Sequence, residues 1–275
     1  MSRFVSALGA LTLGAVALTG CDLIQDNTQY LATVATEVVF VNIPGEALRE
    51  LGVNAPDTVA ITVALGRLTT PENISASPFT GEGVKDAVVK LQLPDGTSLD
   101  LKSDENASGF YYLTNLDDER LTYQEGADYK VSMTFGDQSF WVKVNPTGGA
   151  NLTEPTEMGQ YHEPGTPLTL KWEPASDNAL VAVFDSDGNQ VYDNLPKDLN
   201  SIYNFLTQEE VSTLEIPGTA FGSSYAYGVA LVGMERKPAD TATFSTNLNH
   251  LASNTVTGTA VVTAVTTVDI PDLPQ

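Results

Sequence analysis

The chain has 275 residues and carries 35 aspartates and glutamates against 13 lysines and arginines, a formal net charge of −22. This charge disfavours DNA and RNA as partners, because attraction to phosphates supplies most of the affinity of nucleic-acid-binding proteins. It favours solubility and cationic partners. The single cysteine excludes an internal disulfide framework, and the length suits one large domain or two of ordinary size.

The first 20 residues have the layout of a secretory signal peptide. Arg3 precedes an uncharged run from Phe4 to Leu18. The run is too short for a comfortable transmembrane helix, which needs about 20 apolar residues. We therefore expect residues 1–20 to direct export and then to be removed.

Leu18, Thr19, Gly20 and Cys21 resemble the lipobox of bacterial lipoproteins, in which a bulky apolar residue and two small residues precede an invariant cysteine. The resemblance implies that signal peptidase recognises the first three and that Cys21 then carries diacylglycerol and an N-acyl chain. Two or more acyl chains make a stable membrane anchor. The alternatives for Cys21 are an ordinary signal peptide that ends beside it and a buried free thiol. Asp22 resembles an inner-membrane retention signal of enteric bacteria that other phyla do not follow, so the membrane and the leaflet stay open.

The composition along the chain predicts four segments. The signal peptide (1–20) is followed by a lipidated tether (21–34), which has little core-forming pattern. A first β-sandwich domain is expected at 35–146 and a second at 147–275. The boundary lies in the turn-rich cluster Asn145–Gly149, which follows a complete strand.

Alternation of apolar and polar residues dominates the first predicted domain and is typical of half-buried antiparallel strands. Residues 59–65 alternate in this way, and 89–101 and 129–144 each have the pattern of a hairpin with a glycine-containing turn. The stretch 84–144 resembles the Ig-like and carboxypeptidase-regulatory-type β-domains of secreted bacterial proteins. This resemblance implies a β-sandwich.

The second predicted domain begins with another strand pattern. Residues 167–174, PLTLKWEP, resemble the second strand of a fibronectin type III module, which implies that Trp172 fills the core beside Leu168 and Leu170. Residues 216–233 are similar to a later strand of that family. The predicted fold is therefore all-β, with two tandem antiparallel β-sandwiches.

Two segments depart from the fibronectin pattern. Residues 196–210 insert a polar, helix-like stretch between strands, and residues 255–268 add a long uncharged strand after the expected last one. A strand of this length must be paired or covered, because an exposed flat edge promotes aggregation. We expect it to pair within the second sheet.

Asp185, Asp187 and Asp193 form a candidate calcium site, since carboxylate oxygens suit this cation. The positions that an EF-hand reserves for glycine and glutamate hold Gln190 and Lys197, so the full motif fails. A hairpin turn explains the same residues and is the preferred interpretation. A weak calcium site at the three aspartates is the alternative.

No catalytic arrangement is recognisable in the sequence. His162 and His250 are the only histidines and have no zinc-ligand spacing, and there is no nucleophile elbow or phosphate-binding glycine loop. A carboxylate pair for glycoside hydrolysis stays open, because such residues need only meet in space. Trp141 is the candidate binding aromatic: it is either a contact for a partner or covered by the insert at 67–82.

These patterns together predict a non-enzymatic lipoprotein of the bacterial cell envelope. It has a binding or structural role, uses no cofactor beyond the lipid at Cys21, and contacts the membrane and an envelope protein or glycan, but no nucleic acid. The alternatives are a carbohydrate-active hydrolase and a calcium-dependent adhesin that uses surface carboxylates.

Overall fold

The computed structural model describes residues 32–45, 49, 57–68, 82–104, 108–194, 210–222, 224–243 and 248–267. Strands dominate these residues, and the protein is all-β, as its sequence predicts. Within these ranges no helix is long and apolar enough to cross a membrane. The signal peptide, the lipobox with Cys21, and nearly all of the 67–82 and 196–210 insertions lie outside the described residues.

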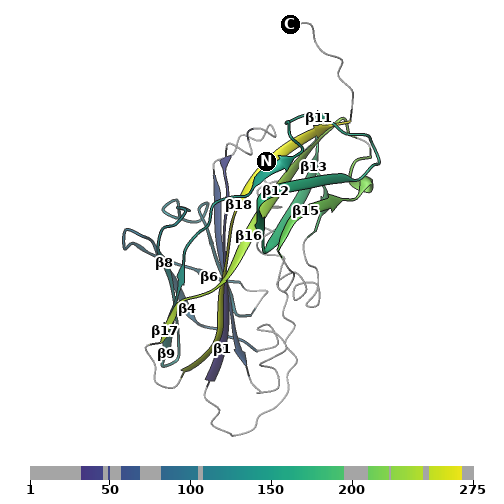
Figure 1. The fold of residues 1–275 in the computed structure, drawn as a ribbon. Coiled ribbons are helices and arrows are strands. Elements are labelled where there is room, and N and C mark those ends of the chain that lie inside the picture. Colours follow the sequence, from purple (N-terminus) through teal and green to yellow (C-terminus); the bar gives the residue numbers. More distant parts are fainter. Residues whose placement is uncertain are drawn as a thin grey trace.

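The strands form three sheets (Figure 1). The large sheet has the order β14-β13-β16-β18-β1-β2-β7-β6, with β11 beside β18 and β3 beside β2. A five-stranded sheet has the order β17-β9-β8-β4-β5, and a three-stranded sheet has the order β10-β12-β15. The large sheet contains β1 (Ala32–Ile43), β2 (Thr58–Leu68), β3 (Glu82–Gly83), β6 (Lys102–Ser103), β7 (Phe110–Thr114), β11 (Gln160–Tyr161), β13 (Asn178–Asp185), β14 (Gln190–Asp193), β16 (Ala226–Pro238) and β18 (Leu248–Thr266). The smaller sheets contain β4 (Val88–Gln92), β5 (Ser98–Asp100), β8 (Tyr129–Phe135), β9 (Gln138–Val144) and β17 (Thr241–Thr243), and β10 (Asn151–Glu154), β12 (Leu168–Ser176) and β15 (Val211–Ile216).

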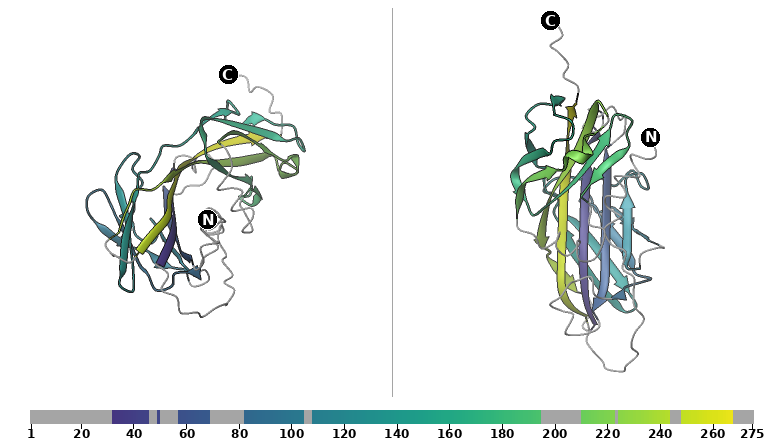
Figure 2. Two further views of the ribbon diagram at one scale, coloured as in Figure 1. Left: turned by 60° about the horizontal axis from the view of Figure 1, so that its bottom comes forward. Right: turned by 90° about the vertical axis from the view of Figure 1, so that its right-hand side faces the viewer.

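Both small sheets pack on the same face of the large sheet. Val38 and Phe40 of β1 belong to the core under the five-stranded sheet, and their register partners on β18 are Thr255 and Thr257. Val265 of β18 is an even number of positions from those two threonines, so its side chain lies on the same face of the sheet. It belongs to the core under the three-stranded sheet. The result is two sandwiches side by side on one curved sheet (Figure 2).

The opposite face of the large sheet carries a third apolar cluster. Its members come from β1, β2, β13, β16 and β18 and are at most 9% exposed. The strands therefore bury apolar side chains on both faces, which explains why β13 and β16 contain continuous apolar runs instead of simple alternation.

Strand β18 pairs with β16 of the second sandwich, as expected, but it also pairs with β1 of the first and so belongs to both. It pairs in parallel with β1 from Leu248 to Thr259 and antiparallel with β16 from Asn254 to Thr266. The physical reason is length: 19 residues at about 3.3 Å each span about 60 Å, more than one sandwich can pair. The chain crosses between the small sheets at residues 145–150, but the shared sheet joins the two halves, so their independence as domains stays a prediction.

Several local predictions are confirmed. The hairpins β4–β5 and β8–β9 form, with Gly96 and Gly136 at positive φ in their turns (88° and 58°), which glycine adopts without strain. Leu168, Leu170 and Trp172 are buried together on one face of β12.

Candidate functional site

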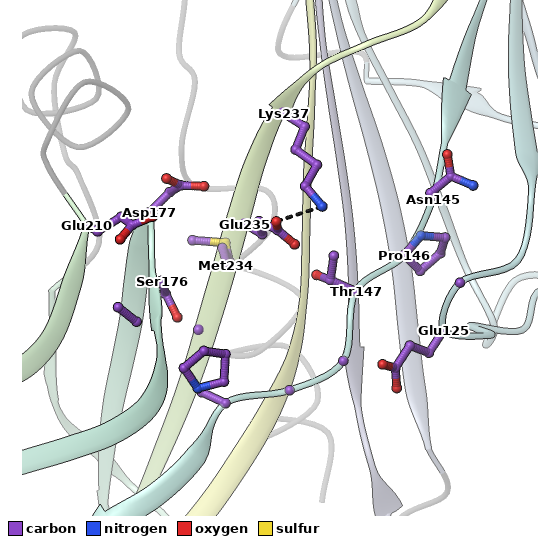
Figure 3. Close-up of a pocket in the computed structure, with 17 residues that line it drawn as sticks. Glu125, Asn145, Pro146, Thr147, Ser176, Asp177, Glu210, Met234, Glu235 and Lys237 are labelled. Atoms are coloured by element: carbon purple, nitrogen blue, oxygen red, sulfur yellow. Dashed lines mark ion pairs between the residues drawn. The ribbon is translucent and has the colours of Figure 1, made fainter.

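A groove of about 600 Å³ lies where the two sandwiches meet (Figure 3). Its floor is the end of β16, from Gly233 to Lys237. One wall is the crossover segment 145–150 together with Glu125, and the other contains residues 174–177 and Glu210. The groove therefore occupies the gap between the small sheets, on the large-sheet face that both of them cover.

The crossover segment is fixed to the large sheet by hydrogen bonds. The N–H of Thr147 donates to Oγ1 of Thr257 (3.2 Å), and the two hydroxyl oxygens are 2.8 Å apart. The hydroxyl of Tyr123 donates to the carbonyl of Thr147 (2.6 Å), and the N–H of Gly126 donates to the carbonyl of Pro146 (2.8 Å). Burial raises the pKa of Tyr123 to about 12, so this donor keeps its proton at neutral pH. This wall is therefore held in place before any ligand arrives.

The opposite wall is packed equally closely. A Cβ atom at Gly233 would lie 2.6 Å from Oγ of Ser176 and 2.9 Å from Cβ of Ala150, so only glycine lets the two walls and the floor meet here. Oγ of Ser176 also accepts a hydrogen bond from Nε1 of the buried Trp172 (3.2 Å). The core tryptophan of the second sandwich thus supports the groove wall.

Among the lining residues that the structure describes, four are carboxylates: Glu125, Asp177, Glu210 and Glu235. Lys237 is the one cation in this described set and forms an ion pair with Glu235 at 2.6 Å. The carboxylate of Asp177 accepts the backbone N–H of Arg236 (2.6 Å). Within the part of the chain that the structure describes, no three or more His, Cys, Asp or Glu side chains are grouped to hold a metal ion. The carboxylates therefore make a dispersed negative lining, not a single cation cage.

Of the predicted calcium residues, Asp185 ends β13, Asp187 lies in the turn that follows, and Asp193 ends β14; all three are away from the groove. The carboxylate of Asp185 accepts the N–H groups of Asp187 (2.9 Å) and Asn189 (2.8 Å), and that of Asp193 accepts Nε2 of Gln190 (2.9 Å). Partial burial raises the pKa of Asp185, but these bonds, above all those from Asn189, outweigh it, and the pKa lies below its usual value. The carboxylate is engaged in stabilising the turn, as the preferred interpretation expects.

Trp141 of β9 is half-buried, and because nearly all of the 67–82 insert lies outside the described residues, both roles given for it stay predictions. Nζ of Lys130 lies 4.6 Å from its ring centroid, and Ala242 of β17 pairs directly opposite it. Strand β17 is therefore the neighbour of Trp141 at the edge of the five-stranded sheet.

Tyr111 and His162 also have local structural contacts. Tyr111 is buried and donates to the carbonyl of Val84 (2.8 Å). The His162 ring packs edge-on against Phe221 at 4.7 Å and is hydrogen-bonded to the carbonyl of Thr166 (2.9 Å). His162 therefore stabilises the end of the second sandwich.

Sequence reasoning missed the groove, because its residues come from five separate stretches of the chain. The one sequence feature at this location that stands out is the turn-rich cluster Asn145–Gly149, which by itself predicts a domain boundary. No protein-family model matches the chain, and no curated protein sequence is significantly similar to it.

Proposed function

We propose that this protein is a lipid-anchored protein of the bacterial cell envelope that binds another envelope component without catalysing a reaction. The lipobox residues Leu18–Cys21 support the anchor. The junction groove supports the binding role and is the observation that carries it: its volume of about 600 Å³ is within the range of ligand sites, about 300–1,000 Å³.

The rigidity of the groove favours binding. Its walls are held by Thr147, Tyr123 and Ser176, and its floor belongs to a sheet that continues through both sandwiches. A site whose walls are already ordered loses little conformational entropy when a ligand binds, so more of the contact energy appears as affinity.

The charge of the groove favours a cationic partner. The described lining residues include four carboxylates and one lysine, which is already paired, and the whole chain has a net charge of −22. Complementary charge accelerates encounter and excludes anionic competitors. The same charge repels an anionic membrane surface, so the groove is expected to face away from the lipid headgroups.

In-cell cross-linking with affinity capture tests this function. The groove variant, Glu125→Gln with Glu210→Gln, removes two lining carboxylates that hold no described strand in place. The control variant, Asp137→Asn with Glu163→Gln, removes one exposed carboxylate from each half of the molecule, outside the groove. We expect one or two envelope partners that the wild type and the control variant recover and the groove variant loses. Equal recovery by all three proteins would remove the groove from the proposed function.

A further inference from the structure

We infer that the groove takes an extended peptide segment of a partner protein that carries several lysine or arginine side chains. This inference depends on the proposed function and names its ligand class. It follows from the placement of the carboxylates, from the unpaired backbone of one wall, and from the residual charge of the groove.

The carboxylates are spread around the groove. Glu125 precedes β8, Asp177 lies between β12 and β13, Glu210 precedes β15, and Glu235 is on β16. No metal-holding group of three exists in the described ranges, so these side chains are too far apart to enclose one ion. A ligand with several cationic groups along its length can contact them separately.

The crossover wall has backbone groups that are free to pair. Gly148 and Gly149 line the groove in an irregular segment, and in the described part of the chain neither makes a hydrogen bond. A Cβ at Gly148 would lie 2.7 Å from Oε1 of Glu125, and one at Gly149 would lie 3.1 Å from the carbonyl oxygen of Thr259, so the two glycines let the crossover segment pack against these neighbours while its own N–H and C=O groups stay unpaired. Extended peptides bind sheet edges by main-chain hydrogen bonds, while side-chain pockets select the sequence, and the unpaired groups of Gly148 and Gly149 can take part in the same kind of bond.

The charge balance selects basic side chains. Lys237 forms an ion pair with Glu235 at 2.6 Å, and the described part of the lining holds three further carboxylates, Glu125, Asp177 and Glu210, and no further cation. An acidic peptide is repelled, and a neutral glycan gains nothing from these charges. A polyamine matches the charges but has no peptide backbone that could pair with Gly148 and Gly149. A basic peptide therefore makes more contacts with the groove.

Fluorescence anisotropy with the purified full-length protein tests the inference. The first probe is a labelled octapeptide of alternating lysine and serine, and the second has proline in place of each serine, so that it keeps its charge but lacks those backbone N–H groups. We expect the groove variant to bind the first probe at least tenfold more weakly than wild type and the control variant to stay within twofold. The proline probe is expected to bind wild type at least fivefold more weakly than the serine probe.

Three outcomes would overturn the inference: equal binding of the serine probe by wild type and the groove variant, equal binding of both probes by wild type, and displacement of the serine probe by equimolar spermidine or calcium chloride. The capture experiment above is independent of these probes. If the groove variant loses a cellular partner while the probes bind unchanged, the ligand class is wrong and the proposed function stands.

Discussion

The carboxylate of Glu37 and the guanidinium of Arg236 form an ion pair through two contacts, at 3.1 and 3.3 Å, although 199 positions separate them in the chain. Glu37 is on β1 and Arg236 is on β16, with β18 between them, and Asn254 of β18 donates a further bond to Glu37 (3.3 Å). The backbone N–H of Arg236 donates to Asp177 in the groove wall. Arg236 therefore connects the N-terminal strand, the shared sheet and the groove.

Arg236→Met is expected to lower the free energy of unfolding by about 3–5 kcal/mol, because Glu37 is only 4% exposed and would be left as a buried charge without a partner. Urea titration followed by far-ultraviolet circular dichroism measures the change. The double variant Glu37→Met with Arg236→Met should recover most of the loss, since it removes both charges from the sheet.

The matched control for Arg236 is Lys90→Met. Lys90 pairs with Asp100 at 3.1 Å, but both side chains are well exposed, at 45% and 77%. Exposed pairs contribute about 0–1 kcal/mol, so this variant should differ little from wild type. A similar small effect for Arg236→Met would contradict the assignment of a buried structural ion pair.

Alkaline pH should destabilise the protein through Tyr123. Its pKa is about 12 in the folded protein against 10.0 in the unfolded chain, so the contribution of this residue is complete below pH 10 and is lost as the pH rises towards 12. Two pKa units correspond to about 2–3 kcal/mol. Tyr123→Phe removes this part of the pH dependence and also the hydrogen bond to Thr147.

The measurement for Tyr123 is the difference between wild type and Tyr123→Phe in unfolding free energy at pH 8, 10 and 11.5. Other buried tyrosines, including Tyr111 and Tyr129, contribute equally to both proteins and cancel in the difference. The stability gap at pH 8 should shrink at the highest pH. A constant gap would show that Tyr123 does not retain its proton in the fold.

Gly233→Ala tests the close contact between the groove walls. The added Cβ would lie within 3 Å of Ser176 and Ala150, and overpacking of this kind costs about 1–3 kcal/mol. Gly222→Ala is the control, because its added Cβ meets no atom within 4 Å. Thermal unfolding of both variants should show a lower melting temperature only for Gly233→Ala; equal melting temperatures would mean that the walls are not in contact.

Cys21→Ser tests the membrane anchor. The lipobox resemblance predicts that the variant is no longer lipidated and moves from the membrane fraction to the soluble fraction after cell lysis. Metabolic labelling with an alkyne fatty acid, followed by fractionation, measures both properties. A variant that is still cleaved and still membrane-bound would refute lipidation at Cys21.

The sequence predicted the strands and hairpins well because their signals are local. The alternation around Leu168, Leu170 and Trp172 identified one buried face, and the turn at Gly136 specified a hairpin. It did not predict the pairing of β1 with β18, because alternation defines which face of a strand is buried but not which distant strand lies beside it. Strand β17 was missed for a related reason: three residues are too few for a periodic signal.

The groove could not be predicted for the same physical reason. The pairing of β13 with β16 brings Asp177 close to Glu235, and Glu125 lies across the same groove because β18 joins the two halves; each of them resembles an ordinary solvated charge in the sequence. The turn-rich residues 145–149 were recognised as unusual, but turn propensity cannot distinguish a flexible linker from a segment that Thr257 and Tyr123 hold against a sheet.

Site-specific photo-cross-linking in cells tests most directly whether the groove is the binding surface. A photoreactive phenylalanine analogue replaces Glu210 in the groove wall or Asp137 at the β8–β9 turn, both of which are exposed positions. We predict a defined cross-linked product with an envelope protein from position 210 and none from position 137. Cross-links from position 137 alone, or the same products from both positions, would contradict the assignment of the groove as the binding surface.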